Sequence, residues 1–325
     1  MNRYVIIGNG KMAIDCLKMA VEAGIGDVAL VVCDSLEETP VSRIATACDE
    51  LGIPCRDNGN VNDPVLVEEI RAIEPDVIFN INSFKIIRED LLAIPKTGVI
   101  NFHNGPLPRY GGVNVCSWAI LEGAPTYGIT WMFVSRGVDT GDLVVQSLFD
   151  LTGREAAVAL VGRCIKEGIR VFPTLLAQIK AGNINRIPQD SAKATYFSRK
   201  DTPYNGLFPF ELPIDALDRY VRAVSFYFME NSFLLPEVRL GDRSLWVGRV
   251  SLDRRERPAS EAGLILEISD SALTVACKLG AAVFRNLIDI HGKPIAIADL
   301  VAEHRLEAGK SGFEVLPVPA LPKKG

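Results

Sequence analysis

The sequence predicts an α/β fold, with a Rossmann-like, doubly wound parallel sheet followed by a smaller C-terminal β-barrel of the OB-like type. Short apolar runs and helical stretches alternate over roughly the first 180 residues. Those runs lack polar alternation, as strands buried on both faces of a parallel sheet do. Beyond the Pro- and Gly-rich stretch at 198–213, the pattern changes to short strands separated by turn residues. We therefore predict a Rossmann-like domain over 1–204 and a barrel domain over 205–325.

The elements follow in order along the chain. Gly24 is expected to end the first helix, and Asp63 is expected to cap a later helix that has Pro64 at its first position. In the first domain we predict strands at 3–8, 27–34, 76–81, 98–103, 127–134 and 142–149, and helices at 11–24, 63–73 and 154–182. In the second we predict a helix at 214–224 and strands at 244–252, 263–269, 272–277 and 282–290.

Composition and charge narrow the class of protein. With 48% hydrophobic and 23% charged residues, the chain has the composition of an ordinary soluble protein. Its net charge is −5, and residues 207–325 hold 15 Lys and Arg against 16 Asp and Glu, which argues against a nucleic-acid partner. Seven cysteines without a CxxC pair are expected to be reduced thiols of a cytoplasmic protein. The absence of a long apolar run or a signal peptide predicts no membrane partner.

A glycine motif follows the first strand. Residues 8–13 read Gly-x-Gly-x-x-Ala, and Asp34 ends the second strand, where a ribose-binding acid would lie. The motif is compatible with an NAD-dependent oxidoreductase. It is also compatible with a tight turn that packs a helix closely on a strand, which is common in α/β folds that bind no dinucleotide.

A second group of residues lies in "NFHNGPLPRYGG", 101–112. Asn101 and His103 end an apolar strand, and residues two apart project to the same face. The prolines and glycines that follow leave this pair at the end of the sheet, where open α/β sheets place their chemistry. Asp139 and Asp142, in a glycine-flanked loop between two strands, are the candidate acids, and the same residues also suit an ordinary turn.

These residues resemble the folate-dependent formyltransferases. Asn-x-His, a Leu-Pro turn and an Asp-x-Gly loop 36 residues beyond the histidine are the family's signature, and the spacing selects Asp139 over Asp142. The resemblance covers about residues 1–200, and more weakly the barrel, which is similar to that of methionyl-tRNA and amino-arabinose formyltransferases. It implies catalytic roles for Asn101, His103 and Asp139, with 10-formyltetrahydrofolate as donor and no metal.

The implied chemistry fits these residue types. Attack of an amine on a formyl carbon builds an oxyanion, which the Asn101 amide and His103 can stabilise by donating hydrogen bonds. The proton transfers suit an imidazole oriented by a carboxylate. The resemblance also implies two folate-binding segments, namely Lys85, Ile86 and Ile87 on one side and Ser135, Arg136, Gly137 and Val138 on the other.

Departures from the family pattern suggest which kind of amine accepts the formyl group. Gly105 and Pro106 replace the common Ser-Leu after the histidine, and Gly111 stands where an arginine is frequent. The methionyl-tRNA enzymes carry a basic insertion after the second strand, but here residues 33–52 are short and acidic, so tRNA is an unlikely partner. We expect a small-molecule amine, such as an amino sugar on a nucleotide or an aminoacyl precursor of a natural product. Methionyl-tRNA formyltransferase and a non-catalytic folate- or nucleotide-binding module are the remaining alternatives.

Overall fold

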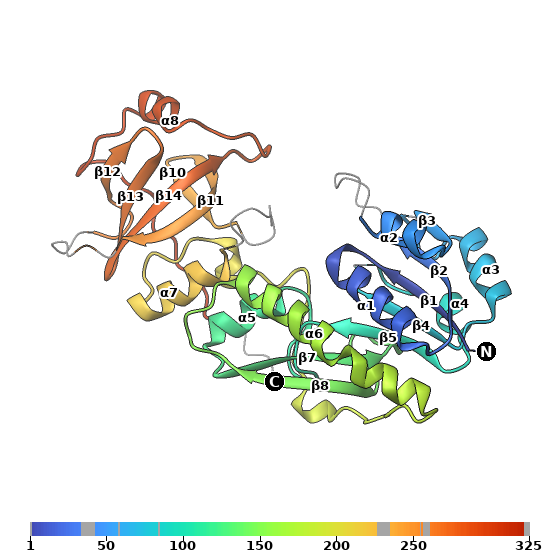
Figure 1. Ribbon diagram of the computed structural model, residues 1–325. Coiled ribbons are helices and arrows are strands. Elements are labelled where there is room, and N and C mark those ends of the chain that lie inside the picture. Colours follow the sequence, from blue (N-terminus) through green and yellow to red (C-terminus); the bar gives the residue numbers. More distant parts are fainter. Residues whose placement is uncertain are drawn as a thin grey trace.

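The computed structural model describes residues 2–33, 43–57, 59–83, 85–225, 235–253, 255 and 261–321. They form a seven-stranded sheet, a five-stranded sheet and a two-stranded sheet. Figure 1 shows the five-stranded sheet set apart from the central one, with α5 and α7 between them. Asp34 and the rest of the acidic stretch up to residue 42 lie outside the described residues.

The central sheet has the strand order β3-β2-β1-β4-β5-β7-β8. Strands β1 to β5 pair in parallel, whereas β7 pairs antiparallel with β5 and β8 pairs antiparallel with β7. The strands are β1 (Arg3–Gly8), β2 (Asp27–Cys33), β3 (Cys55–Asp57), β4 (Val77–Ile81), β5 (Gly98–His103), β7 (Thr126–Phe133) and β8 (Leu143–Asp150). The strand order reverses between β1 and β4, so the sheet has a switch point there, and such sheets bind ligands at the carboxyl ends beside it.

Helices cover both faces of this sheet. They are α1 (Gly10–Ala23), α2 (Arg43–Leu51), α3 (Pro64–Ile73), α4 (Glu89–Leu92), α5 (Val115–Glu122) and α6 (Ala157–Lys180). Buried residues of α1, α5 and α6 share one apolar core, and those of α3 and α4 share the core on the opposite face. Gly24 ends α1 in the left-handed conformation, and the Asp63 side chain accepts from the backbone amides of Val65 and Leu66 at the start of α3. The predicted doubly wound sheet is confirmed.

The C-terminal domain is a five-stranded antiparallel sheet with the order β10-β11-β14-β13-β12. Its elements are β10 (Glu237–Leu240), β11 (Arg243–Asp253), β12 (Ile265–Ser269), β13 (Ala272–Cys277), β14 (Gly280–Ile288) and α8 (Ile297–His304). The predicted strands at 244–252, 263–269, 272–277 and 282–290 all appear, so the β domain is confirmed. Strand β10 and helix α8 were not predicted.

A segment after α8 connects the two edge strands of this sheet. The Phe313 amide donates to the Gly263 carbonyl at 2.9 Å, and the Ile265 amide to the Ser311 carbonyl at 2.8 Å, beside β12. The next amide, that of Glu314, donates to the Arg239 carbonyl of β10 at 2.8 Å. Residues 311–314 therefore close the sheet into a barrel.

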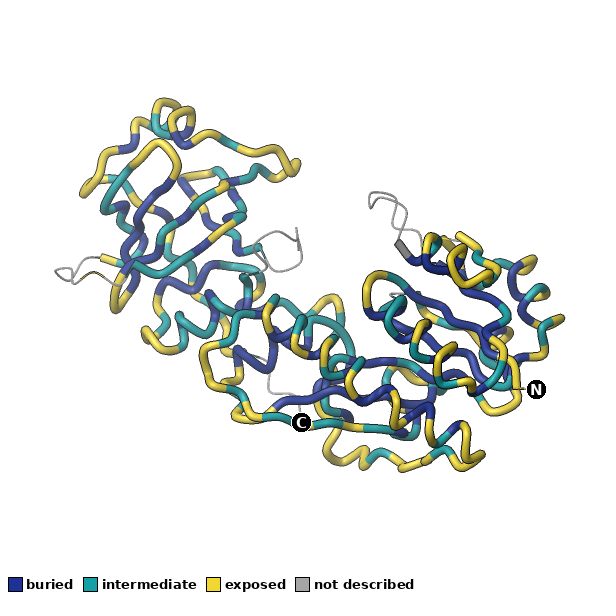
Figure 2. The backbone as a smooth tube through the Cα atoms, viewed as in Figure 1, coloured by how far each residue is buried: buried dark blue, intermediate teal, exposed yellow. Residues whose placement is uncertain are grey.

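Helix α7 (Ile214–Ala223) joins the two parts of the chain. It packs against α5, where the Ser117 hydroxyl donates to the Ala223 carbonyl at 2.8 Å and Arg219 Nε donates to the Leu121 carbonyl at 3.3 Å. One apolar core continues from the central sheet through this junction into the barrel, as the buried stretches in Figure 2 show. The boundary between residues 204 and 205 stays a prediction. Helix α7 follows this boundary in the chain and packs on α5, which precedes the boundary.

The remaining elements are short. Strands β6 (Gly111–Gly112) and β9 (Tyr196–Phe197) pair in parallel. A single 3₁₀ turn, η1, covers Ser191–Lys193, and in the turn η2 (Pro203–Gly206) the residues Tyr204 and Asn205 are in the left-handed conformation. No helix within the described residues combines the length and apolar character needed to cross a membrane.

Candidate active site

Asn101 and His103 lie at the carboxyl end of β5, where the sheet changes from parallel to antiparallel pairing. Asn101 is in register with Asn80 of the parallel neighbour β4, and His103 is in register with Thr130 of the antiparallel neighbour β7. The two side chains therefore belong to one face of one strand but have different neighbours.

Both ring nitrogens of His103 face hydrogen-bond acceptors. Nε2 lies 2.6 Å from the Tyr110 carbonyl oxygen, and Nδ1 lies 3.6 Å from Asp139 Oδ2. Because a carbonyl oxygen only accepts, Nε2 carries a hydrogen in this arrangement. The ring is 6% exposed and the Asp139 side chain 11%, so the pair is largely shielded from water.

Asp139 is held in the β7–β8 connection by backbone groups. Its φ is +56°, and Oδ2 accepts the Gly112 amide hydrogen at 2.8 Å. Gln189 Nε2 donates to the Asp139 carbonyl at 2.9 Å and to the Gly141 carbonyl at 2.7 Å, which fixes the loop from the other side. The second candidate, Asp142, accepts the Phe133 amide hydrogen with its carbonyl, and within the described chain its carboxylate has no recorded ion pair.

Asn101 has a partner that the sequence did not reveal. Asn80 Nδ2 donates to Asn101 Oδ1 at 2.7 Å, which leaves the amino group of Asn101 available for a ligand. The sequence places Asn80 in the predicted strand 76–81 and indicates no further role for it. Its position near the end of a parallel strand adjacent to that of Asn101 was the available signal, but the adjacency itself comes from the fold.

The turn after His103 is held by a buried threonine. Thr130 Oγ1 donates to the Gly105 carbonyl at 2.8 Å and accepts from the Leu107 amide and from Gln146 Nε2, both at 3.1 Å. A Cβ at Gly105 would lie 2.7 Å from both His103 Nε2 and the Tyr110 carbonyl. The glycine thus allows the carbonyl to approach the imidazole.

Thr130→Val is expected to destabilise the protein by about 1–3 kcal/mol. The Gly105 carbonyl and the Leu107 amide lose their hydrogen bonds to the buried hydroxyl and keep only the 3.2 Å hydrogen bond between them. The measurement is the free energy of unfolding in urea. Thr126→Val, at the exposed start of the same strand, is the matched control and should change it by less than about 0.5 kcal/mol. Equal effects of the two substitutions would contradict this account of the turn.

The two predicted folate-binding segments lie next to each other. Arg136 Nε is 2.8 Å from Glu89 Oε1, which links the loop after β7 to the segment that follows β4. The side chain of Asn62 fixes this segment, donating to the Ile86 carbonyl and accepting from the Arg88 amide, both at 2.8 Å.

Each of these segments presents an exposed apolar side chain. Ile86 is 73% exposed and Val138 is 49% exposed. Ile87 packs on the core instead, Lys85 donates its amide to Ser83 Oγ, and the Ser135 hydroxyl lies 2.8 Å from Thr140 Oγ1 across Gly137. Each of the two segments therefore offers one apolar side chain to solvent.

The glycine motif at 8–13 serves the packing of β1. A Cβ at Gly8 would lie 2.4 Å from the Ile81 carbonyl of β4 and 3.1 Å from the Ala13 side chain. This close approach explains the first glycine and the alanine without a dinucleotide. The proposed ribose partner, Asp34, lies outside the described residues.

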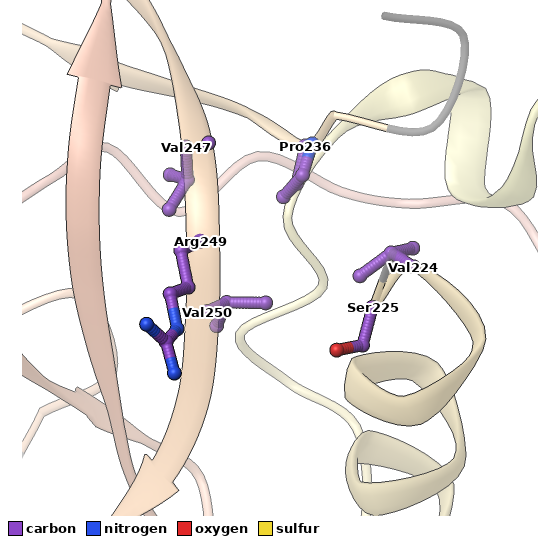
Figure 3. Close-up of a pocket in the computed structure, with 7 residues that line it drawn as sticks. Val224, Ser225, Pro236, Val247, Arg249 and Val250 are labelled. Carbon is purple, nitrogen blue, oxygen red and sulfur yellow. The ribbon is translucent and has the colours of Figure 1, made fainter. Parts of the chain in front are cut away.

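Neither a metal centre nor the small cavity in Figure 3 adds to the site. No cluster of three or more His, Cys, Asp or Glu suitable for a metal occurs among the residues that the structure describes. The cavity, of about 20 Å³, lies between the end of α7 and β11, with Val224, Ser225 and Arg249 in its lining. It has room for about one water molecule and contains none of the predicted site residues.

Two family descriptions match most of the chain. The formyl transferase family matches residues 2–176, and the formyl transferase C-terminal domain matches residues 202–305. The chain therefore belongs to the formyl transferases, and it is an enzyme that transfers a formyl group. The resemblance and enzyme class predicted from the sequence are confirmed.

Its curated relatives include full-length bacterial enzymes. The methionyl-tRNA formyltransferase of Lachnospira eligens is 27% identical over 94% of this chain and 98% of its own length. That of Citrifermentans bemidjiense is 28% identical over 94% of this chain and 95% of its own length.

Solved structures with the same fold include sugar-modifying enzymes. WlaRD, described as a sugar 3N-formyl transferase with dTDP and 5-N-formyl-THF, superposes with a TM-score of 0.62 at 20% identity, over 88% of this chain and 97% of its own. The N-formyltransferase of Helicobacter canadensis, in complex with folinic acid and dTDP-3-aminofucose, gives 0.63 at 17% identity over 88% and 99%. At these identities the likeness shows the shared fold.

Proposed function

We propose that this protein is an N-formyltransferase that moves the formyl group of 10-formyltetrahydrofolate to a primary amine of a small molecule. The observation that carries the proposal is the largely shielded pair of His103 and Asp139, with Asn101 two residues before His103 on the same face of β5, in a chain of the formyl transferase family.

The geometry supports a division of roles among the three residues. The amino group of Asn101 can donate to the oxyanion that forms when the amine attacks the formyl carbon. The Nε2 hydrogen of His103 can do so only when it leaves the Tyr110 carbonyl, which lies 2.6 Å from Nε2. The imidazole can also take a proton from the amine and deliver one to the departing tetrahydrofolate nitrogen. Asp139 orients the ring from the Nδ1 side, and its own carboxylate is oriented by the Gly112 amide.

The folate would lie between the two linked loops. The exposed Ile86 and Val138 offer apolar surface to the flat pterin ring, while the backbone of residues 85–87 and 135–138 offers hydrogen-bonding groups to its edge. The folate ligands named for the two sugar formyltransferase structures agree with this donor.

The charge of the barrel favours a small acceptor over tRNA. Several of its cations are already paired with carboxylates, namely Arg239 with Glu237, Arg243 with Glu303, Lys278 with Glu211 and Lys310 with Glu307. Each pair would have to be rearranged before its cation could neutralise a phosphate. Since phosphate contacts dominate nucleic-acid affinity, this surface suits tRNA poorly.

Methionyl-tRNA formyltransferase is the second candidate, and a specific observation favours it: the curated relatives of Lachnospira eligens and Citrifermentans bemidjiense that span nearly the whole chain carry that name. The two candidates differ in acceptor, not in the formyl-transfer chemistry. A single set of assays can therefore separate them.

The deciding assay follows tetrahydrofolate release from 10-formyltetrahydrofolate in the presence of different amines. The panel contains nucleotide-linked amino sugars, aminoacyl compounds and initiator methionyl-tRNA, with His103→Ala as the inactive control. We expect turnover with a small amine and none with the charged tRNA. Formylation of methionyl-tRNA alone would establish the second candidate. If none of the acceptors in the panel supports the release of tetrahydrofolate, both candidates are refuted.

A binding experiment supplies an independent prediction. We expect no sub-micromolar binding of initiator tRNA at physiological salt in a filter-binding titration, because the barrel lacks a surplus of positive charge. Sub-micromolar affinity that falls steeply with salt, at about 0.9 log units per phosphate contact per decade for duplex nucleic acid, would contradict this expectation.

A further inference from the structure

Asn80 lies beside Asn101 in the sheet, and its side chain reaches the candidate catalytic amide. The two residues are directly in register across β4 and β5, and the Asn80 side chain donates to Asn101 Oδ1 at 2.7 Å. Asn80 is 6% exposed. Within the described residues, this is the one hydrogen bond recorded for the Asn101 side chain.

The direction of this hydrogen bond decides which end of the Asn101 amide faces the site. An amide can rotate by half a turn, which exchanges its acceptor oxygen and its donor amino group. A donor at Asn80 retains the oxygen on the β4 side and so turns the amino group of Asn101 away from β4. We propose that Asn80 is a positioning residue that aligns the Asn101 amino group to donate to the oxyanion, an inference that rests on the proposed function.

The other end of Asn80 argues against a purely structural role. Asn80 Oδ1 is buried and has no hydrogen-bond partner among the residues that the structure describes. A buried amide used only for packing would be expected to satisfy both ends, and the other four residues of β4 are apolar. An apolar residue would therefore suit the strand better, and the benefit of the asparagine lies in the hydrogen that it donates to Asn101.

Two substitutions at position 80 make different predictions. Asn80→Val removes the donor and is expected to lower kcat about tenfold or more, up to the roughly 10²–10³-fold loss expected for Asn101→Ala, since loss of one oxyanion donor has that effect. Tetrahydrofolate binding should be unchanged, because Asn80 is buried behind Asn101. Ile78→Val, two residues earlier on the same face of β4, is the matched control and should retain wild-type kcat.

Asn80→Asp adds a test based on the pH dependence of kcat, which would not change if Asn80 served only to stabilise the fold. An ionised carboxylate accepts from the Asn101 amino group and turns the amide the wrong way, whereas a protonated carboxyl can donate to Asn101 Oδ1. The ratio of its kcat to that of wild type should therefore rise as the pH falls. The corresponding ratio for Asn80→Val should stay constant with pH.

A double-mutant cycle tests whether Asn80 acts through Asn101. In the Asn101→Ala background, Asn80→Val should cause no further loss of kcat, because there is no amide left to align. The inference is overturned if Asn80→Val keeps more than half of the wild-type kcat, or if it lowers kcat by the same factor in both backgrounds.

The same assays separate this inference from the proposed function. If none of the amines in the panel causes the wild-type protein to release tetrahydrofolate, the proposed function is refuted, and the proposed role of Asn80 is refuted with it. If wild type is active and the Asn80 variants behave like Ile78→Val, only the role of Asn80 is refuted.

Discussion

Replacing His103 with alanine or asparagine is expected to lower formyl transfer by about 10²–10⁴-fold, the usual contribution of a general acid–base group. The imidazole of His103 faces the Tyr110 carbonyl with Nε2 and Asp139 with Nδ1. Neither alanine nor asparagine can replace both ring nitrogens. The measurement is kcat for tetrahydrofolate release with the best amine, together with the Kd for tetrahydrofolate. We expect the Kd to stay within about a factor of two, because His103 lies at the strand end and not in the two folate segments.

Comparing the two variants also distinguishes loss of catalysis from loss of the fold. Asparagine can still donate from the same strand position, whereas alanine leaves a cavity in a buried site. Circular dichroism and the unfolding midpoint are therefore recorded for both. If both variants are folded and turn over near the wild-type rate, His103 is not the proton-transferring residue.

Asp139→Asn is expected to cause the second largest loss, about 10²-fold or more, within the range for disrupted acid–base catalysis. The amide lacks the negative charge that faces Nδ1 and presents a donor or an acceptor there according to its rotation, so the ring loses a fixed orientation. Asp142→Asn, three residues further along the same loop, is the matched control, because its carboxylate does not face His103. The readout is kcat as a function of pH for both variants and wild type.

The two aspartates distinguish the competing assignments of the loop. A large loss in Asp142→Asn with near-normal turnover in Asp139→Asn would show that the spacing from His103 was assigned to the wrong residue. Equal losses would indicate that the loop as a whole, and not one carboxylate, is required.

Local patterns were sufficient to predict much of the first domain. The apolar runs predicted its buried strands, Gly24 and Asp63 marked helix ends through their own conformations, and the spacing of Asn101 and His103 put them on one face. The 36-residue distance to Asp139 came from the family resemblance. The residues alone left Asp139 and Asp142 equivalent, and the choice between them depends on which one the β7–β8 connection turns towards His103.

The residues that the sequence did not reveal are those whose function depends on distant neighbours. Asn80 becomes important only because β4 and β5 are adjacent, and Thr130 only because β7 returns antiparallel beside β5. Gln189 reaches Asp139 across 50 residues of sequence. Such pairings are properties of the strand order, which no window along a single sequence contains.

The closure of the barrel by residues 311–314 has a consequence for the solution behaviour of the chain. Without this segment, the Arg239 carbonyl of β10, the Gly263 carbonyl and the Ile265 amide of β12 would lose their partners, and exposed strand edges can pair with strands of other molecules. The match to the C-terminal domain family ends at residue 305, before the segment begins. We therefore expect a chain shortened to the family boundary to pair with other molecules through these strand edges more readily than the full chain, while keeping every residue proposed for catalysis.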